Sequence, residues 1–335
     1  MLNPFDNPAF SMTALSAAIN ILPNSYNRLG DLGLFADKPQ RFRTIAVEEQ
    51  HGVLNLLPTL PVGSPGSLGS RGKRKVRSFT IPHIPHDDVV LPQEVQGIRA
   101  FGSESEILTI AGVMADHLQT MRNKHAITLE HLRFGALKGE ILDADGSVLY
   151  NLFDEFGMAQ PTPIAFKFSD PLTDIKKACL SVVRYIEDNL HGEQCSGIQC
   201  FVGETFFDAL TSHPTVKDAY NRWQDGQALR SDMRASFPLA GLVFEEHRGR
   251  AWSADGVEHR FVAPTEGQVF PLGTQTTFAT YYAPADFNET ANTMALPLYA
   301  KQEPRKFERG TDLHTQSNPL PLCHRPAVLV KLVMT

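Results

Sequence analysis

The chain has 335 residues, enough at about 150 residues per domain for roughly two domains with buried cores. Hydrophobic residues make up 42% of it and charged residues 20%, which excludes a fully disordered chain. The net charge of −6 provides no overall attraction to nucleic acid or anionic lipid.

The first hundred residues do not resemble a compact domain, because prolines interrupt nearly every periodic run. One short helix is predicted from Ser11, its N-cap, to Leu22. Leu15 and Ile19 lie on its apolar face. Since a helix of about twelve residues does not persist alone in water, we expect it to dock on a neighbouring subunit and to be mobile in a free one.

Extended segments after this helix predict a two-stranded arm. Arg43 to Glu48 and Val53 to Thr59 lead outward, and a strand around Val76 to Ile81 returns. A loop rich in Gly, Ser and Pro, Pro61 to Ser70, separates them. A two-stranded ribbon is marginally stable alone, so the arm must pack against something else, and a neighbouring subunit is one candidate.

A long amphipathic helix is the strongest signal in the sequence. It is predicted from Glu104 to Phe134 after a capping box at Ser103, and its ~31 residues would form a rod of ~46 Å. Gly135 and Gly139 are expected to release it into a hairpin at residues 140–152. The apolar stripe that defines it comprises Ile107, Ile110, Met114, Leu118, Met121, His125, Leu129, Leu132 and Ala136.

From about residue 165, alternating elements predict a second domain of α/β or α+β type. The expected helices and strands are 175–186, 198–202, 206–210, 216–223, 242–246, 260–263 and 268–272. One terminal strand is expected within 320–332, after a bend bounded by prolines.

A dense basic cluster lies at the arm tip, with five Lys or Arg residues between Arg71 and Arg77. Such a cluster could contact phosphate or an acidic protein surface. The alternative, which the spacing alone favours, is the solvated end of a hairpin.

The sequence predicts no metal site. His83, His86, Asp87 and Asp88 have suitable side chains, but the two histidines would point to opposite faces of an extended segment. The four cysteines are Cys179, Cys195, Cys200 and Cys323. They are too few for a disulfide scaffold, which favours a reducing compartment, and they lack the spacing of a zinc finger. Cys200 is expected in the core.

No catalytic residue and no cofactor site is predicted. Nucleophile-elbow, dinucleotide-binding and Walker motifs do not occur. His125 is interpreted as a hydrogen-bonded core histidine, and Glu245 to His247 as a polar strand edge. Trp223 and Trp252 are interpreted as core or interface anchors.

Neither an exported nor a membrane protein is expected. The apolar segment near the start has no Lys or Arg before Arg28, unlike a secretory signal. No apolar run approaches the ~18 residues of a membrane span.

Six short segments, in their order along the chain, carry a family resemblance: Ala17–Asn20, Leu29–Phe35, Gly69–Gly72, Arg77–Phe79, Leu137–Gly139 and Gln316–Pro321. With the short helix, the arm, the long helix and the second domain, they resemble major capsid proteins of tailed phages, specifically the lambda-type capsid protein E family. The resemblance covers essentially the whole chain and implies the HK97 fold, an α+β fold class.

The resemblance also implies a domain plan and partners. The plan is an N-terminal arm (1–37), an E-loop (38–92), a P-domain with the spine helix (93–165), an A-domain (166–304) and a strand returning to the P-domain (305–335). Hexamers and pentamers would form an icosahedral shell around double-stranded DNA in the virion, after assembly in the host cytoplasm. Scaffold, portal and decoration proteins are implied further partners.

The subunit interface is expected to use the apolar face of the arm and the basic cluster: Phe10, Leu15, Ile19, Arg71, Lys73, Arg74, Lys75 and Arg77. The alternative function is a nucleic-acid-binding protein that acts through the segment from Arg71 to Arg77. An enzyme would require convergent titratable residues, which the sequence does not offer.

Overall fold

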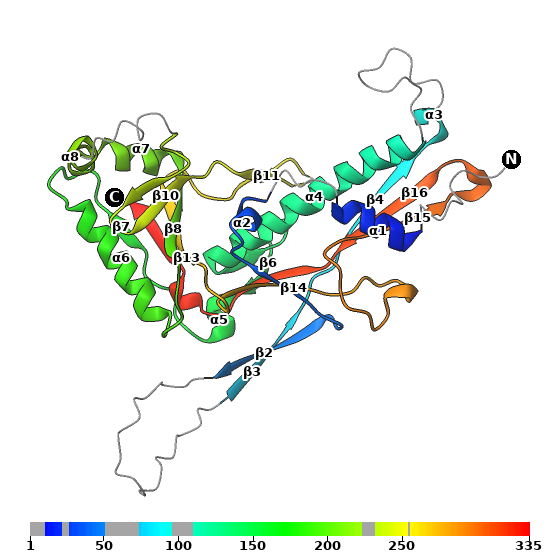
Figure 1. The fold of residues 1–335 in the computed structure, drawn as a ribbon, viewed down its shortest axis with the longest axis horizontal. Helices are drawn as coiled ribbons and strands as arrows, with labels where there is room; N and C mark the ends of the chain where they lie inside the picture. The colour runs from blue at the N-terminus through cyan, green and yellow to red at the C-terminus, as the bar shows by residue number, and fades with distance from the viewer. Residues whose placement is uncertain (1–10, 22–26, 51–73, 96–109, 223–231, 254) are drawn as a thin grey trace, which may run out of the picture.

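The structure is a computed structural model, and it describes residues 11–21, 27–50, 74–95, 110–222, 232–253 and 255–335. A mixed sheet with helices around it occupies one end of the molecule, and a long helix flanked by narrow sheets extends from it toward the other end (Figure 1). This arrangement confirms the α+β class.

The mixed sheet has six strands in the order β7 (Ile164–Phe166), β18 (Val330–Met334), β13 (Glu266–Leu272), β8 (Gly197–Val202), β10 (Leu242–Glu246) and β9 (Phe237–Leu239). The pairs β7·β18 and β8·β10 are parallel and the other pairs antiparallel. The surrounding helices are α6 (Ile175–Asn189), α7 (Glu204–Ser212) and α8 (Pro214–Arg222). The apolar residues that recur at every third or fourth position of α6, from Ile175 to Ile186, are fully buried, as the periodicity of the sequence predicts.

The long helix α4 (Ile110–Lys138) confirms the predicted spine helix, although its expected start before Ile110 lies outside the described residues. It continues through Gly135, which the sequence analysis placed at its end. A Cβ atom at Gly135 would lie 2.8 Å from the carbonyl oxygen of Glu140, so this glycine allows close approach of the following hairpin. The helix ends at Gly139, whose φ of 84° favours glycine.

Two three-stranded sheets accompany α4. One has the order β15 (Tyr299–Pro304), β16 (Thr311–Ser317), β4 (Ile84–Val90), and the other β1 (Ala36–Pro39), β14 (Phe278–Tyr282), β17 (Pro319–Cys323). Met114 and Met121 of α4 are buried with Val90 of β4 and Leu313 of β16. The apolar stripe predicted for the spine helix is therefore buried against a sheet at these positions.

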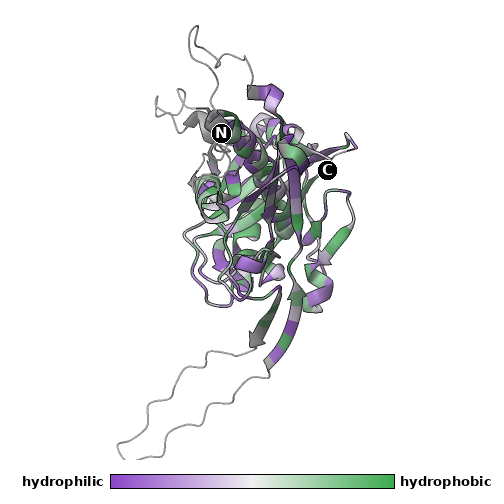
Figure 2. Ribbon diagram, turned by 90° about the vertical axis from the view of Figure 1, so that its right-hand side faces the viewer, coloured by the Kyte–Doolittle hydropathy of each residue, from purple (hydrophilic) through white to green (hydrophobic). Residues whose placement is uncertain are grey.

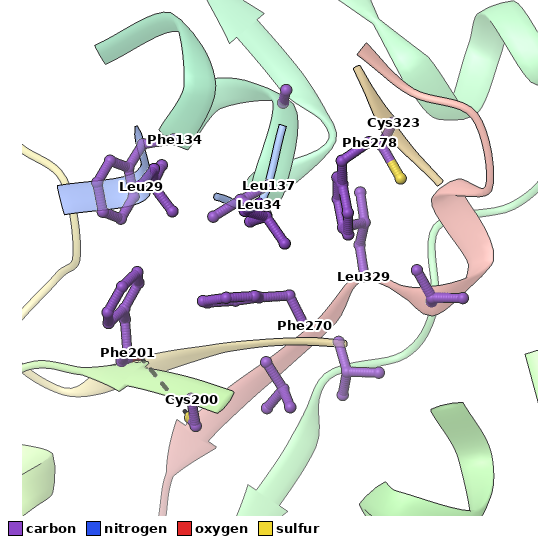
Figure 3. Close-up of a cluster of buried hydrophobic side chains, with 14 of the residues drawn as sticks. Leu29, Leu34, Phe134, Leu137, Cys200, Phe201, Phe270, Phe278, Cys323 and Leu329 are labelled. Atoms are coloured by element: carbon purple, nitrogen blue, oxygen red, sulfur yellow. Dashed lines mark hydrogen bonds between the residues drawn. The ribbon is translucent and has the colours of Figure 1, made fainter. Parts of the chain in front are cut away.

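The main core joins α4 to the six-stranded sheet (Figure 3). The ring of Phe134 on α4 lies 5.6 Å from that of Phe201 on β8 and stacks 4.9 Å from that of Phe261. Leu29, on the segment before β1, packs into the same cluster and is fully buried. Cys200 is also buried there, as predicted. These contacts make the spine helix and the sheet one hydrophobic unit.

The last thirty residues differ from the single returning strand that the sequence predicts. Strand β17 contacts α4, whereas β18 crosses to the six-stranded sheet and pairs with β13 and β7. Between them, Pro326 opens the 3-10 helix η6 (Pro326–Val328), which breaks the extended run. Strands β14 and β15 belong to the two three-stranded sheets and not to the six-stranded sheet, so the expected bounds of 166–304 and 305–335 do not follow the sheets.

Short elements complete the described chain: α1 (Met12–Ile21), α2 (Arg28–Asp31), β2 (Thr44–Gln50), β3 (Arg74–Thr80), α3 (Pro92–Val95), β5 (Glu140–Leu142), β6 (Val148–Asn151), α5 (Leu152–Phe156), β11 (Arg250–Trp252), β12 (Glu258–Arg260), η4 (Asn288–Thr290) and η5 (Lys306–Glu308). The predicted hairpin after the spine helix is confirmed as β5–β6. Trp252 is 59% exposed, which excludes a core position, and its role as an interface anchor stays a prediction.

Candidate subunit interface

The predicted arm is confirmed as a two-stranded ribbon of β2 and β3 that projects from the body of the molecule (Figures 1 and 2). The strands pair antiparallel, from Thr44 opposite Thr80 to Gln50 opposite Arg74. The expected strand 53–59 and loop 61–70 lie outside the described residues.

Aromatic side chains fix the base of the ribbon to the hairpin and helix that follow the spine helix. Phe79 is fully buried, with its ring 5.4 Å from that of Tyr150 and 6.3 Å from that of Phe156. The Tyr150 hydroxyl donates to the carbonyl of Thr80 at 2.9 Å and accepts from its amide at 2.8 Å. The ribbon therefore has a firm base.

Arg77, predicted for a neighbour contact, is bound within its own chain. Its guanidinium donates to the carbonyl oxygens of Glu155 and Phe156, the latter at 2.8 Å. It also lies 4.9 Å from the centre of the Phe156 ring, a cation–π distance. The structure thus assigns Arg77 to the ribbon base, which the sequence could not indicate because 78 residues separate it from Glu155.

The rest of the basic cluster is only partly described. Lys75 is exposed and Arg74 begins β3, whereas Arg71 and Lys73 lie outside the described residues, as does Phe10 of the N-terminal arm. Two apolar side chains that the sequence analysis missed are exposed near the ribbon: Phe42 at 68% and Val76 at 63%. Val76 sits between charged neighbours, so hydropathy averaged over several residues hides it.

An acidic surface lies beside the ribbon base. No Lys, Arg or His occurs between Lys138 and Lys167, and this stretch forms β5, β6 and α5. Its carboxylates are all exposed: Glu140, Asp143, Asp145, Asp154 and Glu155. We call these five residues the acidic surface. Its charge is opposite to that of the basic cluster.

The N-terminal helix packs on its own chain, which differs from the predicted docking on a neighbour. Leu15 and Ile19 are buried with Leu118 of α4 and with Leu298 and Ala300. The Asn20 amide donates to the carbonyl of Leu298 at 2.9 Å. Leu15 and Ile19 therefore offer no free apolar surface to a neighbour in this structure. The residues that cover them lie far away in the chain, on α4 and at Leu298 and Ala300, and helical periodicity contains no information about such partners.

A partly buried ion pair joins the segment before β1 to the six-stranded sheet. The Arg28 guanidinium donates to both carboxylate oxygens of Glu245, at 2.7 and 2.6 Å, and the Gln199 amide donates to one of them at 2.6 Å. Next to it, the amide of Leu29 donates to the buried Glu130 of α4 at 2.9 Å. Glu245 is thus a buried ion-pair partner, which corrects its assignment to a polar strand edge.

Replacing Glu245 with glutamine is expected to lower the free energy of unfolding by about 1–2 kcal/mol, because Arg28 keeps a neutral acceptor but loses its counter-charge. The partial exposure of Arg28 places the loss at the low end for charged pairs. Urea denaturation measures it. Glu289→Gln, which changes an exposed ion pair with Lys301, is the matched control. Its free energy of unfolding should stay within about 0.5 kcal/mol of the wild-type value. Equal losses in the two variants would contradict a special role for Glu245.

The buried histidine and cysteines discussed next have pKa values shifted toward their neutral forms, as expected for side chains in a core. His125 lies 3.0 Å from the Thr315 hydroxyl, which itself donates to the carbonyl of His86, so Nε2 of His125 is the donor. Burial lowers the pKa of His125 to about 3 and raises the pKa values of Cys179 and Cys323 to about 12. The core assignment of His125 is confirmed, and the two thiols stay protonated at neutral pH.

A cavity of about 310 Å³ lies where β8 and β10 end, between Gly203 and Arg260. Its arginines pair with glutamates: Arg248 lies 3.2 Å from Glu204, and Arg250 and Arg260 each lie 3.3 Å from Glu258. Each of the three arginines therefore has a carboxylate partner, although two carboxylates serve the three guanidinium groups. Among the described residues, no group of three His, Cys, Asp or Glu could hold a metal ion. Helices of the described ranges include none with the length and apolarity of a membrane span.

Comparisons with known proteins find capsid proteins. The family model described as phage major capsid protein E matches residues 11–334. The major capsid protein of Salmonella phage Felix O1 is 28% identical, over 98% of each chain. The major capsid protein of Pseudomonas phage KPP10 is 27% identical, over 96% of each chain.

Solved structures share the fold at low sequence identity. A putative capsid protein of a prophage of E. coli CFT073 has a TM-score of 0.63 at 16% identity, over 97% of this chain and 99% of that one. A chain of the mature capsid of bacteriophage PhiM1 has a TM-score of 0.55 at 15% identity, over 94% of this chain and 88% of that one. Both support the HK97-like fold predicted from the sequence.

Proposed function

Because the chain belongs to the phage major capsid protein E family, we propose that it assembles as hexamers and pentamers that close an icosahedral shell around double-stranded DNA. Family membership makes the chain a structural component of the phage capsid, located in the virion. The observation that carries the proposal is the match of one capsid family model to residues 11–334.

Electron microscopy of the purified full-length protein tests this function. Closed shells or rings of five and six subunits are the expected result. Uniform monomers at high protein concentration, with and without added scaffold protein, would contradict it.

We extend the proposal to one subunit contact. The basic cluster of one copy meets the acidic surface of the next, since the two carry opposite charge and belong to different parts of the chain. Such a contact is heterologous, because two different surfaces of identical subunits meet, and repeating it around an axis generates a closed ring. The exposed Phe42 and Val76 near the ribbon add apolar surface to this contact.

The remaining partners stay proposals that rest on the family: scaffold, portal and decoration proteins, and packaged DNA held without sequence preference. The N-terminal arm (1–37), E-loop (38–92) and P-domain (93–165) likewise stay proposed units, and assembly is proposed for the host cytoplasm. The alternative function, nucleic-acid binding through Arg71 to Arg77, has no support in the comparisons. The binding of Arg77 to backbone carbonyls also removes one of its five cations.

A further inference from the structure

His117 lies between two carboxylates that come from different elements. Its ring projects from α4, with Nδ1 2.7 Å from Oδ2 of Asp88 on β4 and Nε2 3.0 Å from Oε2 of Glu94 on α3. Both distances are those of hydrogen bonds. One imidazole thus connects the end of β4 and the short helix α3 to the spine helix.

This geometry requires a proton on each ring nitrogen. A carboxylate only accepts hydrogen bonds, so both Nδ1 and Nε2 of His117 must donate. A neutral imidazole has one N–H group, and the lone pair of its other nitrogen would face a carboxylate oxygen at hydrogen-bond distance. Loss of one proton therefore breaks one of the two contacts.

The contact to Glu94 is the one expected to break. The Asp88 contact is the shorter of the two, and the Asp88 carboxylate also accepts the amide of Val89 at 2.8 Å, which holds it in place. Glu94 belongs to a helix of only four residues and is bound to His117 at 3.0 Å. When one proton remains on the ring, we therefore expect it on Nδ1, where it keeps the hydrogen bond to Asp88.

We propose that His117 is a proton-dependent latch, which holds α3 on the spine helix when protonated and releases Glu94 when neutral. The latch sits at the far end of the strand that returns from the ribbon, because β3 continues through three residues into β4. Its opening therefore frees α3, just beyond the end of that strand, while Asp88 of β4 stays bound to His117. The latch is a property of the single chain, so it is tested independently of the proposed shell.

The charged groups around His117 agree with this role. Burial alone would lower the pKa of His117, but the hydrogen bonds and charges of Asp88 and Glu94 raise it above its usual 6.5. Burial alone would raise the pKa of Asp88, but His117, the Val89 amide and Lys124 of α4 hold that pKa below its usual 3.8. Strand β16 places the apolar Leu313 opposite Asp88, and α1 carries no charged residue.

These directions define the pH range of the latch. A histidine whose pKa is raised by folding stabilises the fold below about 6.5, and this stabilisation is lost as the pH rises through the raised value. An aspartate whose pKa is lowered stabilises the fold above about 3.8 and loses this effect in stronger acid. The latch is therefore closed in mild acid and opens when the pH rises above the raised pKa of His117.

Histidine titration and unfolding of the full-length chain test the latch. NMR should show His117, assigned by its loss in His117→Gln, titrating above pH 6.5, and Glu94→Gln should lower that midpoint. The unfolding constant of His117→Gln should exceed that of the wild type ~3- to 10-fold at pH 6 and approach it at pH 8.5, since glutamine can still donate to one carboxylate.

His191→Asn is the matched control, at an exposed position with a φ of 51° that asparagine tolerates. Its unfolding constant relative to the wild type should not change between pH 6 and pH 8.5. The latch is refuted if His117 titrates at or below 6.5, if Glu94→Gln leaves that midpoint unchanged, or if the effect of His117→Gln is the same at both pH values.

Discussion

Replacing Leu118 with alanine is expected to lower the free energy of unfolding of the isolated subunit by about 2–5 kcal/mol, because it leaves a cavity in a closed cluster. Leu118 is only 4% exposed and is buried with Leu15 and Ile19 of α1 and with Leu298 and Ala300. The cavity would lie between the spine helix and the N-terminal helix. Urea denaturation measures the loss, and hydrogen exchange of residues 12–21 should become faster in the variant.

Leu172→Ala is the matched control, since Leu172 is 90% exposed and its truncation should change stability by less than about 0.5 kcal/mol. A loss for Leu118→Ala as small as that of the control would show that the cluster is not a core. Unchanged exchange of residues 12–21, despite a large loss of stability, would instead show that α1 does not depend on Leu118.

Local patterns predict most elements of the fold. The spine helix, the β5–β6 hairpin and α6 follow from periodicity and turn chemistry, which depend on residues three or four positions apart. The expectation that Gly135 ends the helix is wrong, because a glycine that permits close approach of another segment and a glycine that ends a helix look alike in a sequence. Only the position of the Glu140 carbonyl, which would lie 2.8 Å from a Cβ atom at Gly135, distinguishes the two.

Local sequence patterns cannot predict which residues far apart in the chain contact each other. Arg28 and Glu245 are 217 positions apart, and Ser16 contacts Ala300 across 284 positions. The terminal apolar run could be assigned to a strand, but no local feature indicates that β17 and β18 join different sheets. The choice of partner, in both cases, depends on which surfaces meet after the elements have formed.

The candidate interface shows the same division. The ribbon and its basic cluster could be found from the sequence, because a turn-rich loop between two extended segments is a local signal. The role of Arg77 could not, since carbonyls of α5 satisfy its guanidinium. The acidic surface can be recognised in the sequence as a stretch without Lys, Arg or His, but only the structure shows that it lies beside the ribbon base.

Replacing Lys73, Arg74 and Lys75 together with serine is expected to leave the subunit folded and to prevent or strongly slow shell closure. The reason is that these cations would attract the acidic surface of the next subunit, and such contacts govern association rate and register more than monomer stability. Thermal unfolding checks the fold, and light scattering with electron microscopy checks closure. Lys176, Lys177 and Lys217, exposed on α6 and α8, provide the control when replaced with serine together.

A charge exchange identifies the partner surface. Lys73→Glu with Lys75→Glu should block closure, and so should Glu140→Lys with Glu155→Lys, because either change places like charges in contact. All four changes in one chain should restore closure, since every heterologous contact then again joins opposite charges. Failure of the combined variant, with both pairs folded, would assign the basic cluster to another partner. Normal shells that fail only to retain DNA would assign it to phosphate contacts, whose strength falls steeply as salt rises.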